Sequence, residues 1–394
     1  MIYLHIPRVI SSTDRQGDNQ NLIDFKNKRI FTIDGYCGSA MEAVVKWLSQ
    51  FFSINFVFTL FLTHPHYDHY CGIREMINKK KDGKYVFNID VLYCQNPSIL
   101  KKGLRNNKGS DYVRADISTL EKIIAEAKRR GIKVVYPKNT QKFVIGNIKY
   151  TVYFEQPSYV ANDDTHGDFY LNNGSLCIYF PEFRYFTGGD GPEKIYEMCK
   201  RYGLKPIFFH IPHHGNNCTQ SQARGMKSLG AVYCWDNDPH TYITDFLLYG
   251  RRRCIEAGLK YIGCRTDINV LFYNRKAYIY HGGVQKYTYS ITYSGVSTLK
   301  GATVSVVENT FLGKYGKGDN RVTKLILLGY NPKSVQNKIN SVVDLAKKII
   351  SGEADELGKN QTRINNIDKL LGKGYGELVQ DEINSLLNSK AKRW

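Results

Sequence analysis

Several common signatures are missing from this chain of 394 residues. Its nine cysteines are odd in number and include no Cys-x-x-Cys pair, which argues against a disulfide scaffold and a cysteine-rich zinc site. The chain also lacks the HExxH helix of metalloproteases, the phosphate-binding P-loop and the GxSxG nucleophile turn. We therefore expect reduced thiols and a chemistry that depends on other residue types.

No apolar run is suited to crossing a membrane. The run FFSINFVFTLFL at 51–62 is too short and is interrupted by Ser53 and Asn55. The first residues, MIYLHIPRVISS, lack the basic leader and continuous apolar core of a secretory signal. We expect no membrane span, and synthesis in the cytoplasm without a signal peptide.

Acidic residues are scarce relative to basic ones, 36 against 55, and the formal net charge is +19. Residues 1–299 hold 39 basic and 26 acidic residues, and residues 300–394 hold 16 and 10. An excess that is spread along the chain indicates an anionic partner or substrate, such as nucleic acid or teichoic acid, without choosing between them. The clusters at 79–84 and 101–108 are either solvated surface or guides for such a polyanion.

Short β-rich runs alternate with helical patterns from residue 1 to about 285. This alternation predicts a layered α/β architecture. The predicted helices are 40–52 and 118–131, and the predicted strands are 28–35, 54–64, 88–95, 132–137, 147–155, 175–180, 184–190 and 205–214.

The last hundred residues differ from the rest and contain an internal repeat. LGYNPKSVQNKIN at 328–340 aligns with KGYGELVQDEIN at 373–384, so the Gly-Tyr pair recurs after 45 residues. Each copy predicts a small helical unit whose middle helix ends at the glycine, where a left-handed backbone is needed. We expect a catalytic domain at 1–290, a Ser/Thr/Gly-rich linker at 291–303, and repeats at 304–343 and 344–394.

The stretch THPHYDH at 63–69 follows a buried apolar segment. His64 and His66 point the same way on a strand end and can bind one metal ion, while Asp68 and His69 in the following turn face a second position. Imidazole and carboxylate suit zinc, manganese or iron better than calcium or magnesium. The motif therefore predicts two divalent ions, with Zn²⁺ favoured over Mn²⁺ and Fe.

A site for two ions needs a bridging carboxylate and further imidazoles from elsewhere in the chain. YFTGGD ends a strand at Asp190, and FHIPHHG ends the next strand with His213 and His214. Asp34 also closes a strand. We expect these strand ends to meet the histidine motif at one edge of a sheet.

HxHxDH, a later strand-end aspartate and a further histidine together resemble the metallo-β-lactamase superfamily. The pattern is most similar to the branch that contains the extracellular domain of the competence protein ComEC. NNGSLCIYFPEFRYFTGGD and IPHHG also resemble that branch, in consistent order, over residues 10 to about 285. The resemblance implies a four-layer αββα metallo-β-lactamase fold, here followed by a small all-α repeat region.

The resemblance also implies roles for single residues. His64 and His66 would bind the first metal, and Asp68, His69 and His214 the second. The remaining implied roles are a bridge between both metals for Asp190, charge stabilisation on the substrate for His213, and orientation of a ligand histidine for Asp34. Asp68 and His213 are the candidates for direct catalytic roles, and His213 and His214 could be exchanged.

Two histidines have open roles. Many superfamily members have a third histidine on the first metal, and His166 in DDTHGDF is the candidate here, with a plain loop residue as the alternative. His240 in DNDPH is a candidate for lining the substrate site. His210, on the strand before the HHG motif, is expected to be structural.

The tail resembles the repeated cell-wall-binding modules at the C-termini of phage and bacterial lysins. The first copy keeps Arg321, Tyr330 and Gln336 of that pattern, whereas the second has a longer, more acidic first loop. The implied ligand is the muropeptide part of peptidoglycan.

The favoured function is a metal-dependent phosphodiesterase that acts on a wall-associated phosphodiester of the teichoic acid or phosphorylcholine type. Such an enzyme would reach the cell wall as a phage or prophage product released by lysis, and would otherwise stay cytoplasmic. One alternative is a ComEC-like nuclease that acts on DNA. The other is a wall-binding protein with a non-catalytic metal site.

Overall fold

The computed structural model describes residues 1–8, 17–51, 55–104, 110–155, 168–191, 194–215, 218–237, 249–263, 266–296 and 299–391. The candidate residues His166 and His240 lie outside these ranges. The chain divides into two compact units, one of Met1–Gly282 with Lys286–Ser297 and one of Gly283–Gln285 with Thr298–Trp394. The cysteines in the described ranges are free thiols. No helix within those ranges is both long and apolar enough to cross a membrane.

The first unit contains a nine-stranded sheet in the order β18-β17-β16-β1-β2-β3-β4-β7-β8. Strands β3, β4, β7 and β8 run parallel, and β16, β1, β2 and β3 are antiparallel neighbours. The strands are β1 (Ile2–Ile6), β2 (Gln20–Asp24), β3 (Arg29–Ile33), β4 (Val57–Phe61), β7 (Ile89–Tyr93), β8 (Lys133–Val135), β16 (Ile268–Tyr273), β17 (Lys276–His281) and β18 (Val284–Ser290).

A seven-stranded sheet has the order β15-β14-β13-β12-β11-β10-β9. Strands β12 to β15 run parallel, whereas β9 to β12 pair antiparallel. The strands are β9 (Lys142–Ile145), β10 (Ile148–Tyr153), β11 (Cys177–Phe180), β12 (Tyr185–Thr187), β13 (Phe208–His210), β14 (Tyr233–Asp236) and β15 (Lys260–Gly263). The lysine cluster at 79–84 forms a separate two-stranded hairpin, β5 (Lys80–Lys81) with β6 (Lys84–Tyr85).

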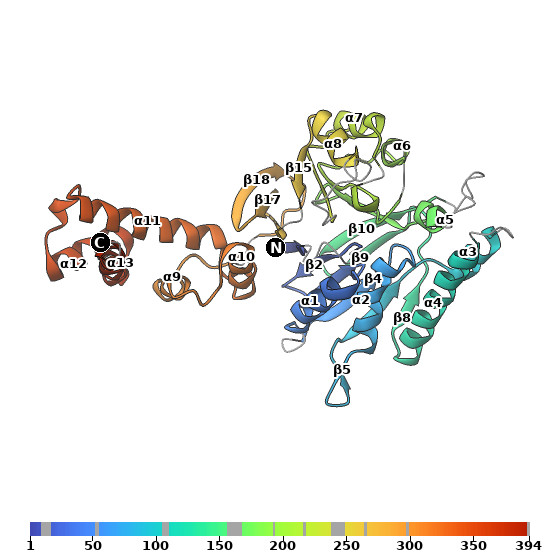
Figure 1. Cartoon of the computed structure of the whole chain (residues 1–394), viewed down its shortest axis with the longest axis horizontal. Helices are drawn as coiled ribbons and strands as arrows, with labels where there is room; N and C mark the ends of the chain where they lie inside the picture. Colours follow the sequence, from blue (N-terminus) through green and yellow to red (C-terminus); the bar gives the residue numbers. More distant parts are fainter. Residues whose placement is uncertain are drawn as a thin grey trace. The chain divides into compact units, whose positions relative to one another are not determined.

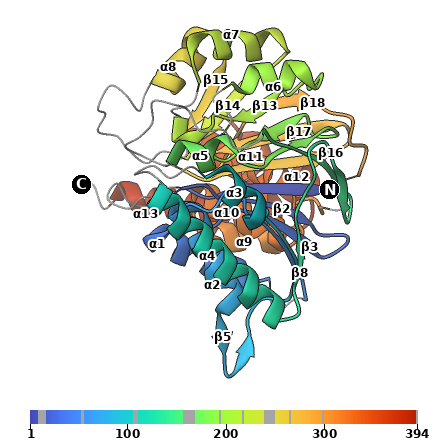
Figure 2. The ribbon, with the colours of Figure 1, turned by 90° about the vertical axis from the view of Figure 1, so that its right-hand side faces the viewer.

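The main core lies between the two sheets, and helices cover their outer faces (Figures 1 and 2). Helices α1 (Gly38–Ser49), α2 (Tyr67–Asn78) and α4 (Ser110–Arg129) cover the nine-stranded sheet, with α3 (Pro97–Gly103) beside α4. Helices α6 (Ile195–Arg201), α7 (Gln220–Ser228) and α8 (Tyr249–Glu256) cover the other sheet, and α5 (Asp168–Asn173) leads into β11. The unit is therefore a four-layer αββα sandwich, which confirms the predicted fold class.

The sequence of β4 shows why the sheet is covered on both sides. Its residues VFTLF are apolar except for one threonine, as expected for a strand whose two faces are buried. Phe61 belongs to the core between the sheets, where Phe31 from β3 stacks on Tyr150 from β10 with ring centroids 4.9 Å apart. Phe58 alternates to the other face and packs edge-on against Phe87.

The second unit is helical over residues 304–391. It consists of α9 (Val304–Phe311), α10 (Gly318–Leu327), α11 (Pro332–Ser351), a short 3-10 turn (Asp355–Leu357), α12 (Asn360–Leu371) and α13 (Tyr375–Ala391). Residues from α9, α10, α11, α12 and α13 share one hydrophobic core. Helix α11 runs through the predicted repeat boundary at 343/344 and ends at Gly352, which has a left-handed φ of 81°. The same helix is therefore the last helix of the first predicted repeat and the first helix of the second.

Candidate metal centre

The polar strand-end residues meet at one edge of the sandwich. Asp34 follows β3 and His64 follows β4 in one sheet, while Asp190 follows β12 and His213 follows β13 in the other. The strands within each of these pairs run parallel, so their carboxyl ends lie at the same edge. The structure thus brings together side chains separated by more than a hundred residues.

The second half of the histidine motif begins a helix. His66 occupies the N-cap position of α2 with an extended backbone (φ −80°, ψ 152°), and Asp68 and His69 lie in the first turn. The expectation that these two residues lie in a turn after the strand was wrong. A carboxylate in the first turn of a helix is stabilised by the partial positive charge at the helix N-terminus, which favours this start.

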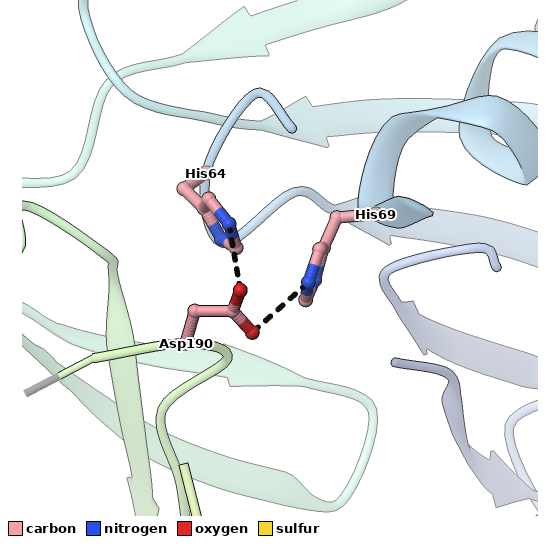
Figure 3. A group of neighbouring side chains, drawn as sticks. All are labelled: His64, His69 and Asp190. Atoms are coloured by element: carbon pink, nitrogen blue, oxygen red, sulfur yellow. Dashed lines mark ion pairs between the residues drawn. The ribbon is translucent and has the colours of Figure 1, made fainter. Parts of the chain in front are cut away.

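Asp190 is the centre of the cluster. Its carboxylate lies between His64 and His69, with His69 Nε2 3.1 Å from Oδ1 and His64 Nε2 3.5 Å from Oδ2 (Figure 3). His214 Nε2 lies 3.5 Å from Oδ1, and His213 Nε2 lies 3.9 Å from Oδ2. One carboxylate is therefore within reach of four imidazoles.

Two sets of side chains could each hold a divalent ion. In the set Asp68, His69, His214 and in the set His64, His69, Asp190, one ligand atom per residue lies within 4.8 Å of the others. Ligands around tetrahedral zinc, bound at ~2.1 Å, stand about 3.4 Å apart. The 3.3 Å between His214 Nε2 and Asp68 Oδ2 is close to that spacing, as are the distances of 3.1 Å and 3.5 Å from Asp190 to His69 and His64. The donor types and spacings therefore fit a divalent ion, although the two sets share His69 and its one free ligand atom.

His66 occupies a less defined place in the cluster. Its Nδ1 lies 3.0 Å from Nε2 of His64, the side chain with which it was expected to share an ion. Its Nε2 is buried and has no hydrogen-bond partner among the residues that the structure describes. His69 instead appears in both compact sets. The predicted pairing of His64 with His66 therefore stays a prediction.

Asp34 contacts the His69 imidazole on the side that faces away from Asp190. Its Oδ1 accepts the backbone N–H of Thr63 at 2.8 Å, and its Oδ2 accepts the Thr63 hydroxyl at 2.7 Å. The same Oδ2 lies 2.9 Å from His69 Nδ1, and both side chains are fully buried. A proton held on Nδ1 by this carboxylate leaves Nε2 free to face the cluster as a ligand.

The HHG turn is built on unusual backbone angles. His213 and His214 both have left-handed φ values, 54° and 52°, which are uncommon outside glycine. The next residue, Gly215, has no room for a side chain, because a Cβ there would lie 2.6 Å from Oδ2 of Asp236. Arg251 donates to both oxygens of that carboxylate at 2.7 Å, so a buried ion pair supports the turn.

Asp18 is a site residue that the sequence analysis did not single out. It is fully buried, accepts a hydrogen bond from Asn237 at 2.8 Å, and lies 3.3 Å from His210 Nε2 and 3.9 Å from His214 Nδ1. It also forms a third compact set with Asp34 and His69. The signal in the sequence was the glycine at position 17, which indicates a turn before the aspartate. In the structure this glycine has a left-handed φ of 60°.

The buried charges of the cluster shift the pKa values of its carboxylates and imidazoles. Burial raises the pKa of Asp190, but His69 and then His214 outweigh it and hold that pKa well below its usual range. Burial lowers the pKa of His214, but Asp190 and then Asp68 outweigh it and raise the pKa to about 10. Burial, with a smaller contribution from His64, lowers the pKa of His66 to about 3, so this imidazole is neutral as a ligand must be.

In the helical unit, two of the expected wall-binding residues are in contact. Arg321 donates to the carbonyl of Gly316 at 3.3 Å and to Oε1 of Gln336 at 3.1 Å. Tyr330 packs against the helical core. In the second repeat, Arg363 donates to the carbonyl of Gly358 at 2.8 Å. GKNQTR therefore forms the same turn as GKGDNR, a match that the alignment on the Gly-Tyr pair missed.

The chain matches no protein-family model and no curated protein. Solved structures similar to it include proteins of the metallo-β-lactamase fold. Unliganded yeast PDE1 is 10% identical with a TM-score of 0.37, over 67% of this chain and 98% of that one. The metallo-β-lactamase fold protein YhfI from Bacillus subtilis is 11% identical with a TM-score of 0.39, over 66% and 95%. A metallo-β-lactamase from Pontibacter korlensis is 15% identical with a TM-score of 0.29, over 52% and 84%. With similarities this low, the fold class rests on the layers of this chain and no activity is taken from its neighbours.

Proposed function

We propose that the chain is a metal-dependent phosphodiesterase whose centre is the cluster around Asp190. One observation carries the proposal: carboxylates and imidazoles from both sheets place their ligand atoms at the spacing of metal ligands. Divalent ions at such a site lower the pKa of a bound water and stabilise negative charge on a reacting phosphoryl group. The net charge of +19 favours an anionic substrate.

In this proposal, some side chains of the cluster bind the metal ions and one contacts the substrate. Asp68, His69 and His214 hold one ion, His64 and His66 hold the other, and Asp190 contacts both groups. His213 is 26% exposed and lies 3.9 Å from Asp190, so it is placed to donate a hydrogen bond to a phosphoryl oxygen of the bound substrate.

Metal content and turnover test the proposal together. The purified protein is expected to contain about two ions per chain and to hydrolyse bis-p-nitrophenyl phosphate. His64→Ala and Asp68→Ala should each abolish turnover. His281→Ala is the matched control, because Nε2 of His281 hydrogen-bonds to the carbonyl of Gly263, which does not belong to the cluster. A protein with metal but no turnover would be a binding protein with a structural metal site, and one with neither would refute the proposal.

We also propose that the helical unit delivers the enzyme to a cell-wall polymer. The support is the recurrence of the arginine-to-glycine turn in both repeats, at Arg321 and at Arg363. The substrate would then be a wall phosphodiester, and the protein would reach it after release from the cell by lysis. In a pull-down on purified peptidoglycan, Arg321→Ala with Arg363→Ala should weaken binding, whereas Lys347→Ala on the exposed face of α11 should not. Equal binding by all proteins would rule out this role of the turns.

A nucleic acid is the second candidate substrate, because the spread of basic residues fits it as well as it fits teichoic acid. The first 299 residues alone carry 39 basic and 26 acidic residues, so the excess charge does not belong to the helical unit only. Cleavage of single- and double-stranded DNA, measured beside phosphate-ester release from teichoic acid, chooses between the two polymers.

A further inference from the structure

Basic side chains are concentrated at the amino ends of the parallel strands β3, β7 and β8. The turn before β3, the hairpin before β7 and the end of α4 before β8 supply them, at residues 25–29, 79–90 and 128–133. These three segments, here called the basic edge, hold eleven basic and two acidic residues. They therefore carry nearly half of the net charge of +19.

Contacts between the three segments make the basic edge one surface. The guanidinium of Arg130, at the end of α4, lies 4.1 Å from the ring centroid of Tyr85 in the hairpin. It also donates to the carbonyl of Ile77, at the end of α2, at 2.8 Å. Arg29 from the first segment pairs with Asp90 at the start of β7. The fold thus gathers cations that lie about a hundred positions apart in the chain.

Most of the positive charge on the basic edge faces solvent. The structure describes all three segments, and Asp82 at the tip of the hairpin is their one exposed carboxylate. The exposed cations are Lys26, Lys28, Lys80, Lys81, Lys84, Lys128, Arg129 and Lys133. One exposed anion against eight exposed cations leaves a field that attracts polyanions.

The basic edge lies at the opposite end of the strands from the metal centre. Asp34 and His64 follow the carboxyl ends of β3 and β4, whereas the basic edge lies at the amino ends of this parallel sheet. Strands of five residues separate the two ends by roughly 16 Å. Figures 1 and 2 show the hairpin of β5 projecting from the sandwich. A small substrate at the metal centre does not reach this surface, but a polymer chain can contact both.

The side chains of the basic edge favour one kind of polyanion. None of the large apolar side chains that are exposed in the described part of the chain belongs to it. Protein partners and membranes are usually held through such apolar anchors. Single-stranded nucleic acids stack on free rings, but Tyr85 and Phe25 are half-buried here and pack against other side chains. Flexible lysine ammonium groups act as point charges, which suits the phosphates of a flexible polymer without bases.

We propose that the basic edge is a second, non-catalytic binding surface for a base-free polymer of phosphodiesters of the poly(glycerol phosphate) type. The inference rests on the proposed phosphodiesterase function and favours a wall polymer over a nucleic acid as its substrate. A chain bound at the basic edge keeps its neighbouring repeats close to the protein. Their effective concentration at the metal centre is then raised, as for any two linked binding sites.

Binding of end-labelled poly(glycerol phosphate), free of peptidoglycan, tests the surface by fluorescence anisotropy. The probe is added to the His64→Ala protein, which should not cleave it. Replacing Lys80, Lys81 and Lys84 together by Gln should weaken binding at low salt by about ten-fold. The slope of log K against log salt should also become shallower by about two units, because three phosphate contacts are lost.

Two further variants keep the binding test specific. Lys128→Gln with Lys133→Gln should also weaken binding, and this variant leaves the hairpin intact. The matched control replaces three exposed lysines of the helical unit by Gln and should bind as the parent does. These lysines are Lys347, Lys348 and Lys369. Equal losses in the hairpin and control variants would show an effect of net charge alone and would overturn the proposal.

Kinetics of the active protein provide the second arm. The hairpin variant should raise KM for the polymer by about ten-fold and leave its kcat unchanged. Turnover of bis-p-nitrophenyl phosphate should not change, because this small ester occupies only the metal centre. An unchanged KM for the polymer would overturn the proposal.

The choice of polymer has its own test. Single-stranded DNA with the same number of phosphates should bind no more tightly than poly(glycerol phosphate). DNA that binds about ten-fold more tightly would overturn the choice of a base-free polymer. Tighter binding to vesicles with anionic phosphatidylglycerol headgroups would overturn it in favour of a membrane surface.

The outcomes separate this inference from the proposed function. Turnover of the small ester, with polymer binding that does not depend on the hairpin lysines, leaves the phosphodiesterase standing and overturns the basic edge. Polymer binding that depends on those lysines, in a protein without metal or turnover, keeps the surface and removes the enzyme.

Discussion

Replacing Asp34 by Asn tests how the cluster is held together. The substitution keeps the shape of the side chain, and Asn tolerates the left-handed φ of 52° at this position, so the backbone is not strained. The amide has one acceptor where the carboxylate has two. If its oxygen accepts the N–H of Thr63, its NH₂ group faces His69 Nδ1, which must then give up its proton. That proton moves to Nε2 and blocks the atom that faces the cluster.

The expected loss follows from these contacts. Removing a carboxylate that orients a ligand imidazole typically costs 10- to 100-fold in metal affinity, or about 1.4–2.7 kcal/mol. We expect Asp34→Asn to lose metal affinity by that factor in a competition titration against a chromophoric chelator. Asp90→Asn is the control, because Asp90 accepts from the Thr59 hydroxyl at 2.9 Å in the same sheet but lies away from the cluster. Thermal unfolding of the metal-free proteins shows whether each variant is folded. Metal affinity within two-fold of the original protein would refute the reasoning about the tautomer.

Two further substitutions probe the framework around the site. Asp267 accepts from His5 Nε2 at 3.1 Å and from the Arg8 N–H at 2.7 Å, and its pKa is lowered because these contacts outweigh the opposing effect of burial. A carboxyl whose pKa is lower in the folded state stabilises the protein at pH values above its unfolded-state pKa. Asp267→Asn should therefore lower the free energy of unfolding in urea by about 1.5–3 kcal/mol at pH 7. A difference between the two proteins that does not shrink on acidification below pH 4 would contradict this. Gly189 has a left-handed φ of 56°, and a Cβ at this position would lie 2.4 Å from the Thr63 hydroxyl. Gly189→Ala should therefore lower both the midpoint of thermal unfolding and the metal content. An unchanged metal content would show that this close approach of the two segments is not needed.

The sequence predicts the central strands well because their burial has a simple signature. Runs such as 28–35 and 54–64 are apolar on both faces, which is typical of parallel strands covered by helices. The start of α2 was not predicted, since the histidine and aspartate at its N-terminus have low helix propensity and resemble a loop. Helix α11 was divided between two repeats because a sequence repeat marks similar units and does not show where one helix serves both.

The site was predicted in part for an equally physical reason. Asp190 and His214 end strands, and the topology of an α/β sandwich brings such ends together without further information. Asp18 could not be found in this way, because it does not end a strand, and the glycine before it indicates only a turn until the fold buries the aspartate beside His210 and Asn237. The assignment of His66 or His69 to an ion depends on the exact positions of their side chains, which a sequence does not encode separately.

The metal ligands come from both sheets, and this has a consequence for how the chain folds. His64 and His69 belong to the first sheet and its helix, whereas Asp190 and His214 belong to the second, so the sets Asp68–His69–His214 and His64–His69–Asp190 each draw on both halves of the sandwich. Ions bound there would cross-link segments more than a hundred positions apart in the chain and would add their binding energy to the packing between the sheets. A nascent chain cannot form this link until residue 214 has emerged, so the ions would stabilise the finished sandwich rather than guide its first steps.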